Sequence, residues 1–227
     1  MGWIKSSILS SVPGLVHGFG DRNVSSDPAV IAGHFGLSGI ARLNQVHGRD
    51  VFLFRDGVLS GGRLADADAV VTALRGVGIG VSSADCVPVL LADGEGRIAA
   101  AVHAGWRGTV SRILDAVLEK IDEEYCIKPS RLNAAIGPSI KKCCYEVGDD
   151  VASLFKDRFE DWSESLVPGD NYKYFLDLGR ANRNSLEKAG VANIEVIDIC
   201  TKCTPEYYSY RGEGKGVGSQ LSVIGLV

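Results

Sequence analysis

Residues 87–103 read VPVLLADGEGRIAAAVH, two apolar runs separated by Asp-Gly-Glu-Gly, and this stretch decides the fold. The four intervening residues have the composition of a hairpin loop. Pairing outward from a four-residue loop places Cys86 opposite His103, with Cβ atoms about 4.5 to 5.5 Å apart. Pro88 cannot donate to the ladder, so Cys86 is expected just beyond a bulge or on an edge. The sequence therefore predicts a hairpin that brings a thiol and an imidazole onto one face, where both can bind one metal ion.

Three further segments place apolar residues at helical spacing. The firmest is 110–121, for which Thr109 is the expected N-cap, and it follows the hairpin directly. Shorter stripes at 151–159 and 178–189 predict two more helices, the second begun by Asp177.

Short runs rich in β-branched and apolar residues predict strands at 50–54, 69–72, 78–82, 87–92, 97–103, 132–136, 194–199 and 221–227. These strands cluster before the first long helix and again at the end of the chain, without strict alternation. This order favours an α+β fold, one domain spanning residues 1–227, with mixed β-sheets flanked by helices. The polar stretch 160–173 is expected to be a surface excursion of that domain.

Composition excludes several kinds of partner. The chain has 227 residues, with 24 Lys and Arg against 28 Asp and Glu, and it contains no basic block, so nucleic acid is not expected to bind. No run approaches the roughly 18 apolar residues that span a bilayer, and the first ten residues do not resemble a signal peptide, so we expect a cytoplasmic protein without a membrane partner. The six cysteines are then reduced thiols or metal ligands rather than a disulfide framework.

His47 is the expected third member of the thiol–imidazole group. It ends the half-apolar run 43–48, LNQVHG, where a terminal side chain can point into a cleft. With Cys86 and His103 it would give three protein ligands and an open fourth position, which is typical of a catalytic zinc site. The alternative is that each of these side chains is only a packed, buried residue.

Residues 103–109, HAGWRGT, form a small-residue turn that leads into the firmest helix. Free N–H groups at a helix start, together with Arg107, can hold an anion such as phosphate, although Arg107 can equally pair with a surface carboxylate. Asp85 should face away from Cys86 and so orient a ligand or cap a turn. Cys200 and Cys203 have C-x-x-C spacing, but the other neighbouring cysteines are adjacent in sequence, which disfavours a zinc or redox site there.

Several strings resemble one known family, the YfiH family, first labelled multicopper polyphenol oxidase or laccase and now described as purine nucleoside phosphorylase. They are NQVHG (44–48), ADADAVVT (65–72), SADCVPVLLAD (83–93), VHAGWRGT (102–109), IGPSI (136–140), CYEVG (144–148) and YSYR (208–211).

The resemblance implies a YfiH-like single α+β domain with zinc held by His47, Cys86 and His103. It also implies phosphorolysis of adenosine, inosine, guanosine and methylthioadenosine, with inorganic phosphate as co-substrate, and deamination of adenosine.

Substrate contacts are implied in the same way. The string FGDR (19–22) is similar to an early F-x-T-R string of the family, which makes Arg22 a candidate substrate or phosphate contact. Asn44 and Ser82 are further candidates. Residues 218–220 read GSQ where the family commonly has G-R-Q, so one cationic contact is expected to be missing.

Other functions remain open. Multicopper oxidation is excluded by stoichiometry, because a blue-copper centre alone takes two histidines and a cysteine, and four histidines cannot also supply a further His-rich cluster. Cys86 as a nucleophile with His103 as its base would make a cysteine hydrolase or deamidase, acting on a substrate such as a cell-wall precursor. A third possibility is a non-catalytic interaction domain stabilised by zinc.

Overall fold

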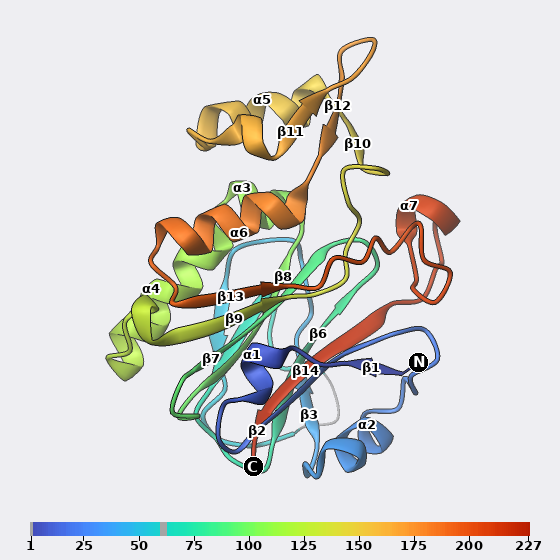
Figure 1. Ribbon diagram of the computed structural model, residues 1–227. Helices are drawn as coiled ribbons and strands as arrows, with labels where there is room; N and C mark the ends of the chain where they lie inside the picture. Colours follow the sequence, from blue (N-terminus) through green and yellow to red (C-terminus); the bar gives the residue numbers. More distant parts are fainter. Residues whose placement is uncertain (1, 60–62) are drawn as a thin grey trace.

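Two β-sheets packed face to face form the centre of the protein (Figure 1). The computed structural model describes residues 2–59 and 63–227. The five-stranded sheet has the order β1 (Trp3–Ile4), β2 (Leu15–Gly20), β14 (Gln220–Leu226), β6 (Gly78–Ser83) and β3 (Ile40–Arg42). The six-stranded sheet has the order β13 (Asn193–Val196), β9 (Leu132–Ile136), β7 (Val87–Asp93), β8 (Ala99–Ala104), β5 (Ala69–Thr72) and β4 (Val51–Leu53).

Both sheets are mixed, which confirms the predicted α+β class. The pairs β3–β6, β4–β5 and β9–β13 run parallel, and the remaining pairs of these two sheets run antiparallel. Strand β7 is apolar on both faces because Leu90 packs between the sheets while Val89 and Leu91 face the helices on the other side.

Helices cover the outer face of each sheet. The six-stranded sheet carries α3 (Trp106–Val110), α4 (Ile113–Tyr125) and α6 (Leu178–Lys188). Helix α5 (Asp149–Arg158) packs beyond them, and the apolar sides of all four helices join one buried cluster with the sheet. Helix α2 (Pro28–Phe35) packs on the five-stranded sheet. The remaining helical elements are short: α1 (Ser7–Ser10), α7 (Tyr210–Glu213) and the 3-10 turns η1 (Pro129–Arg131) and η2 (Trp162–Glu164).

The helix after the hairpin starts earlier than predicted. Thr109 is not its N-cap: Gly105 occupies that position, and the Thr109 hydroxyl donates to the Gly105 carbonyl 3.0 Å away, inside the first turn. Arg112 then adopts a left-handed φ of 64° and divides the expected helix into α3 and α4. The predicted apolar stripe is nonetheless buried, because Ile113, Val117 and their neighbours at helical spacing all face the sheet.

The hairpin register differs from the prediction by two residues. His103 pairs with Pro88 rather than Cys86, because pairing ends at Ala92 and Ala99. The Asp93 carboxylate explains the wider loop, since its Oδ1 accepts the N–H groups of Arg97 (2.6 Å) and Ile98 (3.0 Å) and removes both from the ladder. A slip of two residues preserves the face, so Cys86 and His103 still lie on the same side.

Some elements were not predicted. The stretch 160–173 contributes η2 and β11 (Leu166–Pro168), which pairs with β12 (Lys173–Leu176) and thereby with β10 (Glu146–Gly148) in a small third sheet beside α5 (Figure 1). His47 does not end a strand, since β3 stops at Arg42 and His47 lies in a loop with φ of 60°. Within the described ranges no helix is long and apolar enough to cross a membrane.

Candidate active site

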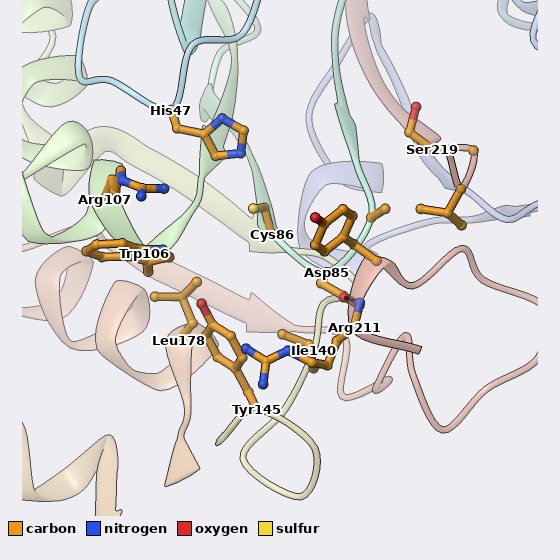
Figure 2. Close-up of a pocket in the computed structure, with 14 residues that line it drawn as sticks. His47, Asp85, Cys86, Trp106, Arg107, Ile140, Tyr145, Leu178, Arg211 and Ser219 are labelled. Atoms are coloured by element: carbon orange, nitrogen blue, oxygen red, sulfur yellow. Dashed lines mark hydrogen bonds between the residues drawn. The ribbon is translucent and has the colours of Figure 1, made fainter. Parts of the chain in front are cut away.

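A cavity of about 590 Å³ opens where the connections after β6 and β8 meet the segment around α7 (Figure 2). His47 and Cys86 lie in its wall, beside the aromatic side chains of Trp106 and Tyr145. Pockets of this size that combine apolar walls with a few charged groups typically bind small molecules.

The structure brings the three predicted ligands together. Ligand atoms of His47, Cys86 and His103 all lie within 4.8 Å of one another, and the two imidazole rings meet edge-on with centroids 4.9 Å apart. The Gly105 backbone passes close to this group: a Cβ there would stand 3.1 Å from Cys86 Sγ and 3.2 Å from a carbon of the His47 ring. A residue without a side chain is therefore what allows the three groups to converge.

Asp68, for which the sequence predicted no role, organises this group. Its carboxylate is fully buried, and Oδ1 lies 2.8 Å from Nδ1 of His103. The same carboxylate accepts the backbone N–H groups of Val46 (3.1 Å), His47 (3.0 Å) and Gly48 (2.7 Å), which hold the loop that carries His47. Because Nδ1 of His103 faces Asp68, its Nε2 is free to face Cys86.

The electrostatics of the site favour an ionised Cys86 thiolate beside a protonated His103 imidazole. Burial alone would lower the pKa of His103, but Asp68 and Cys86 raise it to about 9. Burial alone would likewise raise the pKa of Cys86, but hydrogen bonds from His103 and His47 lower it to about 7. The pKa of Asp68 is also lowered, since its hydrogen bonds to His103 and Gly48 outweigh burial.

These residues fit a metal ion. One thiolate and two imidazoles are a donor set that zinc accepts, and a buried carboxylate on the far nitrogen of one imidazole is the usual arrangement that orients such a ligand. Three protein ligands would leave one position of a four-coordinate ion open. His17 and His34 take no part, because His17 accepts the Ser6 N–H and His34 stacks on Trp3, so the described histidines build no His-rich copper cluster.

Of the four predicted substrate contacts, only Arg107 lines the cavity. Its guanidinium lies 4.4 Å from the centroid of the Trp106 ring. Arg22 is engaged elsewhere: it forms a 2.7 Å ion pair with Glu213 and donates to the Tyr207 carbonyl. A substrate contact at Arg22 stays a prediction.

Asn44 and Ser82 support the loop that leads to His47 and lie outside the described cavity lining. The Asn44 amide donates to Asp66 Oδ1 at 2.7 Å. The backbone of Ser82 exchanges two hydrogen bonds with the Gln45 side chain, at 2.7 and 2.8 Å.

A second arginine, Arg211, faces the cavity and was not predicted (Figure 2). Asp85 positions its backbone: one carboxylate oxygen accepts the Arg211 N–H at 2.6 Å and the other accepts the Thr201 hydroxyl at 2.7 Å. Asp85 therefore holds the first turn of α7, although Ser209 is the N-cap residue of that helix. The Arg211 guanidinium lies 5.1 Å from the Tyr145 ring centroid and donates to the Glu146 carbonyl. The string 208–211 was the available signal for Arg211.

The α+β fold places a candidate Cys–His metal-binding group in the wall of a small-molecule cavity, an arrangement typical of an enzyme. The chain belongs to the family described as multi-copper polyphenol oxidoreductase laccase, whose model matches residues 16–227.

The relatives of this chain carry other names than the family does. A purine nucleoside phosphorylase of Deinococcus radiodurans is 39% identical over 208 residues, which are 90% of this chain and 78% of that protein. Adenosine deaminase RL5, from an unknown prokaryotic organism, is 42% identical over 165 residues, 71% of this chain and 63% of that one.

Solved structures share the fold. The YfiH protein of Bacillus licheniformis superposes with a TM-score of 0.88 at 24% identity, covering 94% of this chain and 93% of that one. A Neisseria meningitidis protein gives a TM-score of 0.88 at 26% identity, covering 100% of this chain and 99% of that one. The resemblance inferred from the sequence strings is confirmed.

Proposed function

We propose that this protein is a zinc-dependent purine nucleoside phosphorylase that also deaminates adenosine. The observation that carries the proposal is the convergence of His47, Cys86 and His103 beside a cavity with aromatic and cationic walls. Relatives named purine nucleoside phosphorylase and adenosine deaminase support the same class of substrate.

The cavity suits a nucleoside. A purine base is flat and apolar, and Trp106, Tyr145 and Leu178 provide an apolar surface for it in the cavity wall. The cavity volume of about 590 Å³ lies within the range of small-molecule sites. We propose adenosine, inosine, guanosine and methylthioadenosine as substrates, because all four share a purine base on a ribose.

Arg107 and Arg211 are proposed to bind phosphate, since both line the cavity and a phosphate dianion is best held by guanidinium groups. In phosphorolysis a phosphate oxygen forms a bond to C1′ of the ribose, the bond from C1′ to the purine breaks, and the purine takes the electron pair and a proton. In deamination water adds to C6 of adenosine and ammonia leaves.

The protein groups hold the reactive centre in place. Asp68 fixes the ring orientation of His103 and the loop of His47, while the Cys86 thiolate supplies negative charge toward the cavity. A zinc ion held by the three ligands supplies Lewis-acid chemistry and an open coordination position. Trp106 and Tyr145 exclude water from one side of the bound base.

Product analysis tests the proposal. Purified, metal-analysed protein is incubated with adenosine, with and without phosphate, and adenine, inosine and hypoxanthine are separated by chromatography. We expect adenine only with phosphate, inosine in both cases, and loss of all products in folded Cys86→Ala protein. Retained phosphorolysis in that variant would refute the role of zinc. Inactivity of the wild type on every nucleoside would overturn the enzyme assignment and favour an interaction domain.

One observation favours a second candidate, a cysteine hydrolase or deamidase. Cys86 lies beside His103, which in turn lies beside Asp68, and the pKa of the Cys86 thiol is about 7. This arrangement suits a nucleophile (Cys86), its base (His103) and a carboxylate that orients the base (Asp68). Activity that resists chelators but is abolished by thiol alkylation would support this candidate, and stoichiometric zinc with chelator-sensitive turnover would refute it.

A further inference from the structure

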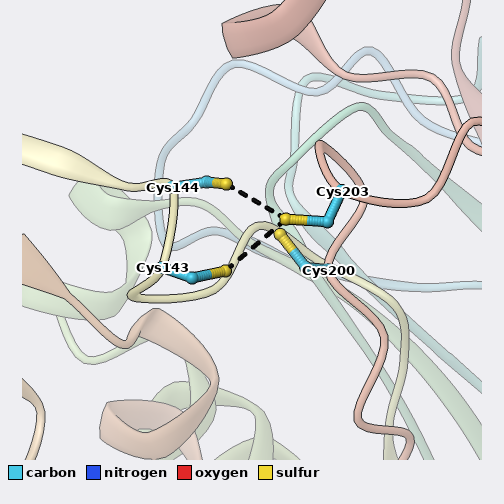
Figure 3. A group of neighbouring side chains, drawn as sticks. All are labelled: Cys143, Cys144, Cys200 and Cys203. Carbon is cyan, nitrogen blue, oxygen red and sulfur yellow. Dashed lines mark hydrogen bonds between the residues drawn. The ribbon is translucent and has the colours of Figure 1, made fainter.

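Four cysteines that are far apart in sequence meet outside the active site (Figure 3). Cys143 and Cys144 come from the connection between β9 and β10, and Cys200 and Cys203 from the connection after β13. All four sulfur atoms lie within 4.8 Å of one another. Cys203 Sγ is 3.7 Å from Cys143 Sγ and 3.3 Å from Cys144 Sγ. Cys143 and Cys144, which are adjacent in sequence, thus supply the second pair of thiols that the C-x-x-C motif of Cys200 and Cys203 lacks in the sequence.

The spacing matches one tetrahedral ion. Zinc–sulfur bonds of about 2.3 Å place the four sulfur atoms of a tetrahedral site about 3.8 Å apart. A disulfide requires sulfur atoms at about 2.05 Å, well below the separations observed here. A four-iron cluster with one cysteine at each corner needs its sulfur atoms farther apart than a single ion does.

The backbone already fixes both turns. Thr201 N–H donates to the Ser139 carbonyl and Ser139 N–H to the Ile199 carbonyl, both at 3.2 Å, so the two connections lie side by side. Cys144 N–H closes its own turn on the Lys141 carbonyl at 2.9 Å. Little reorganisation is therefore needed for four-fold coordination.

The charge of the surroundings fits as well. Four thiolates around a divalent cation carry a net charge of −2. Lys142 and Lys202 are exposed residues next to cysteines of the cluster in the two turns, and their charge is opposite in sign to that of such a site. The backbone N–H groups of Lys141 and Cys203 also hydrogen-bond the Cys200 sulfur.

We propose that Cys143, Cys144, Cys200 and Cys203 bind a second zinc ion in a closed, structural site. Binding replaces the four thiol protons, which are released to solvent, by four zinc–sulfur bonds, and nothing is oxidised or reduced. All four positions are filled by protein ligands, so no position remains for a substrate.

The second zinc would hold one wall of the active-site cavity. Tyr145, which lines the cavity, directly follows Cys144. Thr201 lies between Cys200 and Cys203 in the other turn and donates to Asp85, which in turn holds the backbone of Arg211. One ion thus ties together the two connections that present Tyr145 and Arg211.

Metal analysis in the Cys86→Ala background isolates this site, because that variant lacks a ligand of the proposed catalytic zinc. We expect one zinc per chain in Cys86→Ala, none in Cys86→Ala/Cys203→Ser, and one in Cys86→Ala/Cys126→Ser. Cys126 is the matched control, an exposed free cysteine outside the cluster. X-ray absorption of Cys86→Ala should show four sulfur neighbours at about 2.3 Å.

The proposal would be overturned if Cys86→Ala contained no zinc or bound iron instead. It would also be overturned if X-ray absorption showed nitrogen or oxygen neighbours of the zinc, or if these cysteines formed a disulfide in protein purified under reducing conditions. If Cys203→Ser does not fold, the absorption spectrum of Cys86→Ala decides alone. If Cys86→Ala does not fold, native mass spectrometry of the wild type decides, with two zinc ions expected. None of these measurements depends on turnover, so a failure of the proposed enzyme activity remains distinguishable.

Discussion

Asp68 combines two tasks at one buried carboxylate. It faces His103 and also collects three backbone N–H groups of the loop that carries His47. An asparagine in its place keeps the shape but loses the negative charge, and its amide can accept at one atom only. Both imidazole ligands depend on this single residue.

We therefore expect Asp68→Asn to lower zinc affinity or turnover by about 10- to 100-fold, the usual effect of removing a partner of a metal ligand. Zinc titration and nucleoside turnover measure the two effects. Asp157→Asn is the matched control, because Asp157 is exposed on α5 and lies outside both the cavity lining and the group of His47, Cys86 and His103. Equal behaviour of the two variants would contradict the role of Asp68.

His17 gives the protein a specific dependence of stability on pH. Burial lowers its pKa from 6.5 to about 4, and Nε2 accepts the Ser6 N–H at 2.8 Å. Between these two pH values the unfolded chain binds a proton that the folded protein does not. The free energy of unfolding thus decreases as the pH falls through this window, by up to roughly 3 kcal/mol from this residue.

His17→Gln should remove this contribution while retaining an acceptor for the Ser6 N–H. Urea denaturation at pH 7.5 and pH 5 measures the difference, which should be smaller in His17→Gln than in the wild type. His34→Gln, at an exposed histidine, should leave the difference unchanged. A pH dependence identical in all three proteins would show that His17 is not responsible.

At the scale of elements, the sequence predicted what depends on local pattern. The strands over 69–72 and 132–136 have the predicted bounds, because short runs that are mostly apolar and lie between turns need no distant information. The register of the hairpin was wrong because the Asp93 side chain, rather than the loop composition, ends the pairing. The edge strand β1 has only two residues, too few for a detectable period.

The site was predictable to a similar degree. The structure brings together the three candidate ligands that the sequence predicted, each of which lies beside a segment whose pattern predicts a strand. Asp68 and the cysteine cluster were missed because their roles arise from contacts between segments far apart in the chain. Arg22 and Arg107 looked equivalent as cations in the sequence, and only the packing shows that Arg22 pairs with Glu213 while Arg107 reaches the cavity.

Helix α2 allows two opposite predictions from neighbouring glycines. Gly33 lies inside the helix, and a Cβ there would meet nothing within 4 Å, so Gly33→Ala should stabilise the protein by about 0.5 to 1 kcal/mol. Gly36 ends the helix with a left-handed φ of 70°, so Gly36→Ala should destabilise it by about 1 kcal/mol. Midpoints of urea denaturation measure both changes, and shifts of the same sign would contradict the assigned helix end.

At the scale of the whole molecule, both candidate metal sites join segments that are distant in sequence. If both bind zinc, metal removal should destabilise the folded state, by about 4 kcal/mol for one site when free zinc is a thousand times its Kd. Scanning calorimetry with and without a strong chelator should therefore show a lower unfolding temperature for the stripped wild type.

The variant Cys86→Ala/Cys203→Ser lacks a ligand at each site, so its unfolding temperature should be the same with and without chelator. Cys126→Ser should respond as the wild type does. A wild type that unfolds at the same temperature in both conditions would rule out a contribution of metal to stability.

The place of β14 in its sheet has a consequence for protein synthesis. This strand lies between β2 and β6, yet it is made long after both of them. While the ribosome is still translating, β2 and β6 each keep one unpaired edge, and such edges tend to associate with other chains. Closure of the sheet must therefore wait until Gln220–Leu226 emerge from the exit tunnel, and a message truncated before codon 220 would yield an aggregation-prone product.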